Sequence, residues 1–110
     1  MKYLLLIADD PAAVAAAPDR TQEYIKFTEG IVASGEMVGG ERLHGVDNAT
    51  SVRVRNGRTL ATDGPFAETK EQLGGYYLVD VSDLDRALEL AAQIPAARTG
   101  VVEVRPIWDM

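Results

Sequence analysis

Residues 63–81, with the sequence DGPFAETKEQLGGYYLVDV, constrain the fold of this 110-residue chain more than any other stretch. The Asp-Gly-Pro start combines an acid, a conformationally free backbone and a fixed φ, which is typical of a tight turn. The run from Gly74 onward carries aromatic and branched side chains that suit a pleated strand. Because this run is apolar at successive positions, both faces of the predicted strand need cover from water.

Composition narrows the class of protein. At 46% hydrophobic residues, residues 1–110 fit one compact domain with its own core. The absence of cysteine excludes a disulfide framework, so we expect a cytoplasmic protein. The apolar run at residues 3–8 is too short for a secretion signal or a membrane span, and no membrane partner is expected. A net charge of −6 argues against nucleic acid as a partner.

Hydrophobic spacing predicts two helices and a set of strands. Apolar residues at helical spacing predict a helix that begins at Pro18 and ends at Gly35, preceded by a loose helical turn in the alanine-rich segment 11–17. A second helix is predicted with Ser82 as its N-cap and Pro95 as its stop. Strands are predicted at residues 2–8, 37–43 and 101–107 and from Gly74 to residue 81.

Residues 51–62 contain the clearest local signal in the chain. Two alternating runs flank Asn56-Gly57, the pair that favours a two-residue type I′ hairpin turn. In the register that this turn sets, one face of the hairpin carries three cations, Arg53, Arg55 and Arg58.

The order of predicted elements is strand, helix, strand, inserted hairpin, strand, helix, strand. With right-handed crossovers this order gives an α+β fold, the ferredoxin-like βαββαβ sheet with an inserted β-hairpin and both helices on one face. Two helices leave the other face bare, and the strands at residues 2–8 and 74–81 are apolar on both sides. A second copy is therefore expected to cover that face, which gives a two-fold homodimer.

The stretch at residues 63–81 resembles the signature of the DGPF domain proteins, part of the YCII-related group. The resemblance extends to the opening KYLLLI, the GEMVGGERL region, the TSVRVRNG hairpin and the tail from Ile94 to Ile107. It implies small bacterial proteins of ferredoxin-like fold in a dimeric α/β-barrel assembly, occasionally associated with extracytoplasmic-function sigma factors. It implies no established substrate.

Simpler YCII-like proteins carry a His early in the first helix and an Asp near the end of the second, which have been regarded as a catalytic pair. This sequence has Thr21, Gln22, Glu23 and Tyr24 at the first place, and no Asp before Pro95 at the second. The pair is therefore not transferred to this chain.

Candidate acid–base residues come from elsewhere in the sequence. Asp63 is a general base if its turn lies beside an apolar interface, or else a structural residue whose carboxylate accepts backbone N–H groups. His44, the single histidine, is a candidate because histidine is the commonest general acid and base, although a lone histidine at a strand end is more often a surface residue. With no cysteine and one histidine, a zinc site is not expected. Tyr76 and Tyr77 point to opposite faces of their strand, and one of them is a candidate ligand donor.

The polar loop beside the hairpin supplies the candidate binding residues. Phe66 in the Gly64-Pro65-Phe66 turn is expected to fill core or dimer interface. The three charged residues after it either orient a small polar ligand or are solvated: Glu68, Lys70 and Glu71. The hairpin arginines form an anion site or, as we favour, pair with Glu68 and Glu71 of the same or the partner chain.

Two classes of function follow. The first is a non-catalytic dimeric module that binds a small molecule or a protein such as a sigma factor. The alternative is a cofactor-free enzyme of small-molecule acid–base chemistry that uses Asp63 with His44 or a tyrosine. The glycine pairs Gly39-Gly40 and Gly74-Gly75 lack the spacing of a phosphate loop and are interpreted as places of close backbone contact.

Overall fold

The strand β1 (Lys2–Asp9) is the centre of the sheet in the computed structural model, which describes residues 1–109. Its side chains alternate, with Tyr3, Leu5 and Ile7 buried against the helices. The antiparallel neighbours of β1 are β5 (Gln72–Asp80) and β6 (Val101–Pro106), and β2 (Met37–Arg42) pairs with β5. The strand order β2-β5-β1-β6 is that of a ferredoxin-like sheet.

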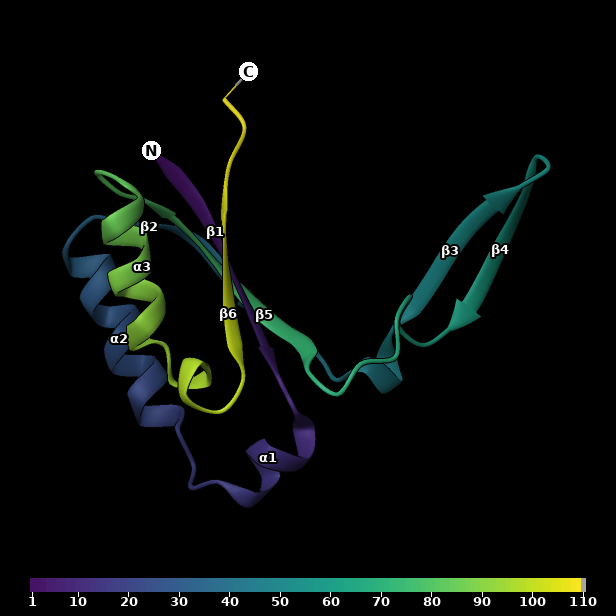
Figure 1. Cartoon of the computed structure of the whole chain (residues 1–110), viewed down its shortest axis with the longest axis horizontal. Helices are drawn as coiled ribbons and strands as arrows, with labels where there is room; N and C mark the ends of the chain where they lie inside the picture. Colours follow the sequence, from purple (N-terminus) through teal and green to yellow (C-terminus); the bar gives the residue numbers. More distant parts are fainter. Residues whose placement is uncertain (110) are drawn as a thin grey trace.

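Two helices cover one face of this sheet (Figure 1). α2 (Thr21–Ala33) buries Phe27 and Ile31, and α3 (Leu84–Gln93) buries Ala87, Leu90 and Ala91. These side chains meet those of β1 and Val79 in one apolar core. The short helix α1 (Pro11–Ala16) occupies the segment where a loose turn was expected, and two 3₁₀ turns, η1 (Val46–Asn48) and η2 (Pro95–Arg98), complete the helical elements of residues 1–109.

The ends of α2 follow local rules. Gly35 has a φ of +79°, and the backbone N–H of Glu36 donates to the carbonyl of Ile31 at 3.0 Å, which is the expected glycine cap. The predicted start was wrong, because α2 begins at Thr21 and not at Pro18. The Asp19 carboxylate accepts the Thr21 backbone N–H at 2.9 Å, and this side-chain bond turns the chain just before the helix.

The N-cap of α3 also differs from the prediction. Asp83, not Ser82, caps the helix, and its carboxylate accepts the backbone N–H of Arg86 at 2.9 Å. The predicted stop is confirmed, since α3 ends at Gln93 and Pro95 starts η2.

The hairpin is formed by β3 (Thr50–Arg55) and β4 (Arg58–Asp63), with positive φ at Asn56 and Gly57 as a type I′ turn requires. It is a separate two-stranded sheet and stands off on the side of the main sheet opposite the helices (Figure 1). Leu60 lies opposite Arg53, and Arg55 lies opposite Arg58, as the turn predicted.

The face of the main sheet turned away from the helices is apolar at its centre. Leu4 pairs with Leu78 and Leu6 pairs with Tyr76 across β1 and β5, on the face opposite Leu5 and Val79. We call these four residues, Leu4, Leu6, Tyr76 and Leu78, the uncovered face. No helix of residues 1–109 is long and apolar enough to span a bilayer.

Candidate functional site: a cavity between α2 and the sheet

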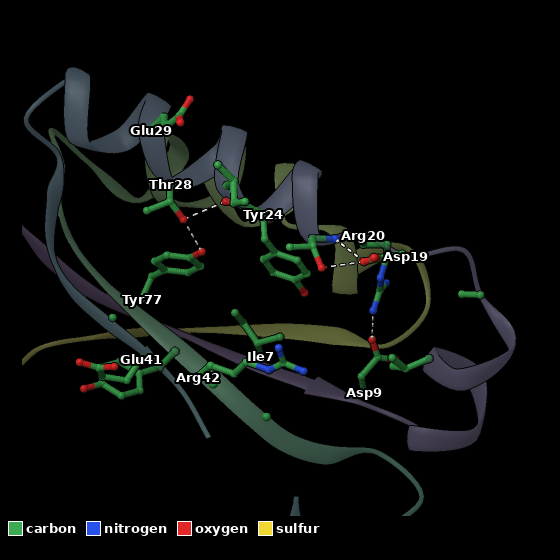
Figure 2. A pocket seen from close by; sticks show the side chains of 18 of the residues that line it. Ile7, Asp9, Asp19, Arg20, Tyr24, Thr28, Glu29, Glu41, Arg42 and Tyr77 are labelled. Carbon is green, nitrogen blue, oxygen red and sulfur yellow. Dashed lines mark hydrogen bonds and ion pairs between the residues drawn. The ribbon is translucent and has the colours of Figure 1, made fainter. Parts of the chain in front are cut away.

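A cavity of about 660 Å³ lies between α2, the segment before it, and the β1, β2 and β5 strands (Figure 2). Its lining combines apolar, aromatic and charged side chains, including Ile7, Asp9, Arg20, Tyr24, Thr28, Arg42 and Tyr77. Its volume falls in the range of about 300–1,000 Å³ that is usual for small-molecule sites.

Glycines open the sheet side of the cavity. Gly75 lies in register between Ile7 of β1 and Arg42 of β2, and Gly40 lies opposite Tyr77. A β-carbon would come within 2.9 Å of the Glu41 carbonyl oxygen at Gly75, and within 2.9 Å of the Tyr76 carbonyl oxygen at Gly40. The prediction of close backbone contact is therefore confirmed at Gly40 and Gly75, whose missing side chains leave room above the strands. It was wrong at Gly39 and Gly74, where a β-carbon would meet nothing within 4 Å.

Tyr77 is held in place by α2. Its ring packs edge-on against Phe27 at 5.1 Å between centroids, and its hydroxyl lies 2.8 Å from Thr28 Oγ1. Thr28 Oγ1 donates its only proton to the Tyr24 backbone carbonyl at 2.9 Å, so the Tyr77 hydroxyl donates to Thr28. The Tyr77 ring is consequently a fixed wall of the cavity.

Tyr24 enters the cavity from the next turn of α2 toward its N-terminus (Figure 2). Burial raises the pKa of the Tyr24 phenol, against the opposing effect of the Arg20 guanidinium. The hydroxyl therefore stays protonated at neutral pH and is able to donate a hydrogen bond to a ligand.

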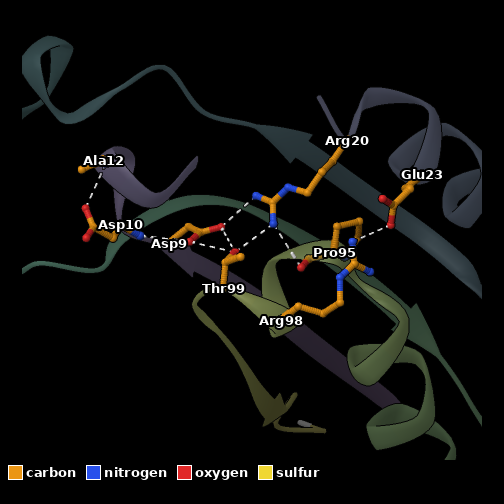
Figure 3. Close-up of polar contacts among 8 residues, drawn as sticks. All are labelled: Asp9, Asp10, Ala12, Arg20, Glu23, Pro95, Arg98 and Thr99. Atoms are coloured by element: carbon orange, nitrogen blue, oxygen red, sulfur yellow. Dashed lines mark hydrogen bonds and ion pairs between the residues drawn. The ribbon is translucent and has the colours of Figure 1, made fainter. Parts of the chain in front are cut away.

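Arg20 belongs to a closed polar cluster at one end of the cavity (Figure 3). Its guanidinium donates to Asp9 Oδ2 at 2.9 Å, to Thr99 Oγ1 at 2.8 Å and to the Pro95 carbonyl at 3.1 Å, and its side chain is only 11% exposed. These hydrogen bonds tie together the ends of β1, α2 and η2. Because Asp9 also neutralises the charge of Arg20, this side chain is poorly placed to attract an anion.

Arg42, unlike Arg20, is a cation of the cavity that is not neutralised by a neighbouring acid within residues 1–109. It projects from β2 on the helix side of the sheet, next to Gly75, and is exposed. Within residues 1–109 its guanidinium forms no ion pair or hydrogen bond. Arg42 is therefore the cavity residue with free capacity for a negatively charged group.

The structure brings only two of the predicted site residues to this cavity, Tyr76 and Tyr77. By strand alternation the Tyr76 side chain lies on the uncovered face, whereas Tyr77 lies on the helix side, as expected of adjacent residues in a strand. Asp63 at the end of β4 and His44 after β2 are both exposed and lie outside the cavity lining.

The turn at Asp63 is held by hydrogen bonds that involve the Gly64 backbone and not the Asp63 carboxylate. The Gly64 N–H donates to the Ala49 carbonyl at 2.8 Å, and Ser51 Oγ donates to the Gly64 carbonyl at 2.7 Å. The Asp63 carboxylate accepts no hydrogen bond from residues 1–109, so its expected structural role is not the one observed. Pro65 follows Gly64, whose φ of +106° makes the turn.

The charged loop and the hairpin remain apart in the single chain. Phe66 is 84% exposed and so does not fill the core of its own chain. Within residues 1–109, neither Glu68 nor Glu71 forms an ion pair with Arg53, Arg55 or Arg58, so the pairing expected inside one chain was wrong. Lys70 approaches Asp10 at 3.9 Å. Pairing between two chains stays a prediction.

Sequence reasoning missed Asp9, Arg20, Tyr24 and Arg42 as cavity residues. A signal for one of them was present, because alternation along β2 places Arg42 on the same face as Gly40, whose partner in β5 is Tyr77. The others come from segments that only the tertiary fold brings together. The residues of 1–109 form no cluster of three or more histidines and carboxylates that could hold a metal ion.

The strand order and the one-sided helices define an α+β protein of ferredoxin-like fold. The chain belongs to the YCII-related domain family, whose model matches residues 1–110. An uncharacterised protein of Rhizobium meliloti (strain 1021), R00369, is 36% identical over an alignment 114 residues long. The alignment covers 97% of this chain and 92% of the relative.

A solved structure shares the fold. The 5-chloro-2-hydroxyhydroquinone dehydrochlorinase TftG from Burkholderia phenoliruptrix AC1100, in complex with 2,5-dihydroxybenzoquinone, matches with a TM-score of 0.56 and 13% sequence identity. The match covers 99% of this chain and 94% of that one.

Proposed function

We propose that this protein binds a small, planar, negatively charged molecule in the cavity between α2 and the sheet. The observation that carries the proposal is the guanidinium of Arg42, which has no partner within residues 1–109 and lies in a cavity walled by the rings of Tyr24 and Tyr77. A guanidinium recognises a carboxylate or phenolate through paired hydrogen bonds, and aromatic walls favour a flat ligand. A small aromatic acid meets both requirements.

The proposal is tested by ligand-induced stabilisation. Benzoate, salicylate and 2,5-dihydroxybenzoquinone are each added at millimolar concentration, and the unfolding temperature is followed by fluorescence. At a ligand concentration one hundred times its dissociation constant, binding stabilises the folded state by about 2.7 kcal/mol. We expect at least one compound to raise the unfolding temperature of the wild type.

Variants locate the site. Arg42→Gln removes the proposed anion contact at an exposed position and is expected to abolish the shift, whereas Arg53→Gln, the same change outside the cavity, retains it. A shift that survives Arg42→Gln, or the absence of any shift with all three compounds, contradicts the proposal.

A second candidate function is catalysis in the same cavity. The position of the Tyr24 hydroxyl inside the cavity supports a role for it in orienting a substrate by hydrogen bonding, and a dehydrochlorinase of the same fold supports an enzyme of ring chemistry. Turnover of a chlorinated hydroxyhydroquinone that is lost in Tyr24→Phe supports this candidate. The acid–base pairing of Asp63 with His44 or a tyrosine is tested alongside it, because that pairing requires loss of turnover in Asp63→Asn.

The assembly belongs to the same proposal. The apolar centre of the uncovered face supports a homodimer in which two sheets pack face to face, giving a dimeric α/β barrel. A sigma-factor partner and a cytoplasmic location stay proposals that rest on the family resemblance and on the lack of cysteine.

A further inference from the structure

The β3–β4 hairpin differs in charge from the rest of the chain. We call residues 50–63 the arm. The arm carries three arginines and one aspartate, a net charge of +2. The other 96 residues carry eight basic and sixteen acidic side chains, a net charge of −8. A cationic arm on an acidic protein is complementary to a second copy of that protein.

Neither face of the arm has a partner among residues 1–109. One face carries Val52 and Val54, which are 62% and 59% exposed, with Ala61 opposite Val52. The other face carries Arg53, Arg55 and Arg58, and within residues 1–109 none of these forms an ion pair. The arm therefore exposes apolar and cationic groups side by side, as a contact surface does.

The two-stranded structure of the arm contributes little to its stability. A hairpin of two strands is marginally stable alone in water, and within residues 1–109 this one is not paired with the main sheet. The radius of gyration of 15.8 Å exceeds the value of about 13 Å expected for a compact domain of this length, because the arm projects away (Figure 1). An arm kept in this position needs another surface to pack on.

The main sheet offers the matching surface. The arm projects on the same side as the uncovered face (Figure 1). Register places Glu41 of β2 beside Tyr76 and Glu103 of β6 beside Leu6. Arg105, opposite Leu4, pairs with Glu103 at 3.5 Å, whereas Glu41 forms no ion pair within residues 1–109, so the free acid of this face lies on the β2 border. The arginines of the arm fit the acidic β2 border, which lies beside the apolar centre.

We propose that the arm is a dimerisation arm, which lies against the acidic body of a second copy of this chain. The partner's arm makes the same contact in return, as a two-fold interface requires. The arm lies outside the lining of the ligand cavity and adds a second contact to the face-to-face packing of the sheets.

The test compares two valines of equal exposure. Val54 on the arm and Val32 on α2 are each 59% exposed, so Val54→Glu and Val32→Glu introduce the same charge at equally accessible positions. Sedimentation equilibrium measures the dissociation constant of the dimer of 11.9 kDa chains. We expect Val54→Glu to raise it at least tenfold and Val32→Glu to change it less than twofold.

A second variant tests the charges. Replacing Arg53, Arg55 and Arg58 by Gln removes the cationic face and is expected to raise the dissociation constant at least tenfold at low salt. Rising ionic strength should then weaken the wild-type dimer more than the variant. Far-UV circular dichroism of each variant tests whether the body is folded. The ligand-induced shift in unfolding temperature is also measured in Val54→Glu, so that failure of the proposed arm contact is distinguished from failure of the proposed ligand site.

Cross-linking identifies the contact directly. Because the chain has no cysteine, Val54→Cys accepts one photoreactive maleimide label. In a mixture of ¹⁵N-labelled and unlabelled protein, we expect cross-linked peptides that join an arm of one isotope to a body of the other. A wild-type mass of one chain, a dimer unaffected by Val54→Glu, or cross-links within single chains only would each overturn the proposal.

Discussion

At the scale of single residues, the neighbours of a side chain decide its chemical role. Arg20 and Arg42 both line the cavity, but Asp9, Thr99 and the Pro95 carbonyl use up the hydrogen-bonding capacity of Arg20 on one side. Arg42 has no such neighbours within residues 1–109, so the same side chain is structural in one place and available in the other.

Glu36 shows the same principle in its titration. Its carboxylate accepts hydrogen bonds from Arg86 Nε and Nη2, both at 2.8 Å, and from Ser34 Oγ at 2.7 Å. Hydrogen bonds from Arg86 and then Ser34 lower the pKa of Glu36 from 4.5 to about 2. A lowered folded-state pKa stabilises the fold above the ordinary pKa, and this stabilisation is lost as the pH falls toward 2.

We therefore expect Glu36→Gln to lower the free energy of unfolding by about 1 kcal/mol at pH 7, a modest value because Arg86 is partly exposed to solvent. The difference from the wild type should shrink as the pH falls from about 5 to about 2. Urea unfolding at a series of pH values measures it, with Glu68→Gln in the exposed loop as control. A difference that is independent of pH contradicts the assignment.

At the scale of elements, the sequence predicted which helices and strands form better than where they begin. The predicted apolar stripe of α3 was confirmed at Ala87, Ala91 and Ile94, which are buried. It was wrong at Leu84 and Leu88, which are each 47% exposed while Leu90 is buried, and the cap was wrong by one position. Ser82 and Asp83 are both good N-cap residues, so their identities rank them about equally. The entry of the chain from β5 decided for Asp83. The α2 start was likewise decided by one side-chain bond, from the Thr21 N–H to Asp19.

The α3 cap gives a matched pair of variants. Asp83→Ala removes the acceptor for the Arg86 backbone N–H and should lower the free energy of unfolding by about 1 kcal/mol. Ser82→Ala should change it by less than about 0.5 kcal/mol, as is usual for surface positions without a special role. Chemical denaturation at pH 7 measures both. Equal effects of the two changes would refute the cap assignment.

At the scale of the whole molecule, the helices cover one face of the sheet only, and this defines the surface that is available for assembly. α2 and α3 bury one side of the sheet, and the other side leaves the uncovered face without helices (Figure 1). The hairpin, whose own contacts are between residues near in sequence, projects on the side of the sheet that has no helices, where it can contact another molecule.

This layering predicts the effect of a charge at the centre of the sheet. Leu6→Arg on the uncovered face should convert the proposed dimer to a single chain of 11.9 kDa, because a charge buried between two packed apolar sheet faces is strongly disfavoured. Leu88→Arg on α3, at a leucine that is 47% exposed, should leave the dimer intact. Light scattering coupled to size-exclusion chromatography measures the mass. A dimer that persists in Leu6→Arg would exclude the face-to-face assembly.

By itself the sequence determined the features that depend on near neighbours: the strand β1, the helix α3 with its stop at Pro95, the Gly35 cap and the Asn56-Gly57 turn. These follow from backbone geometry and from burial within a few residues. The candidate cavity depended on longer distances, since Tyr24, Arg42 and Tyr77 come from three separate elements. Only the tertiary structure decided that Asp63 and His44 lie outside it and that the hairpin stands clear, because packing between distant segments sets which side chains meet.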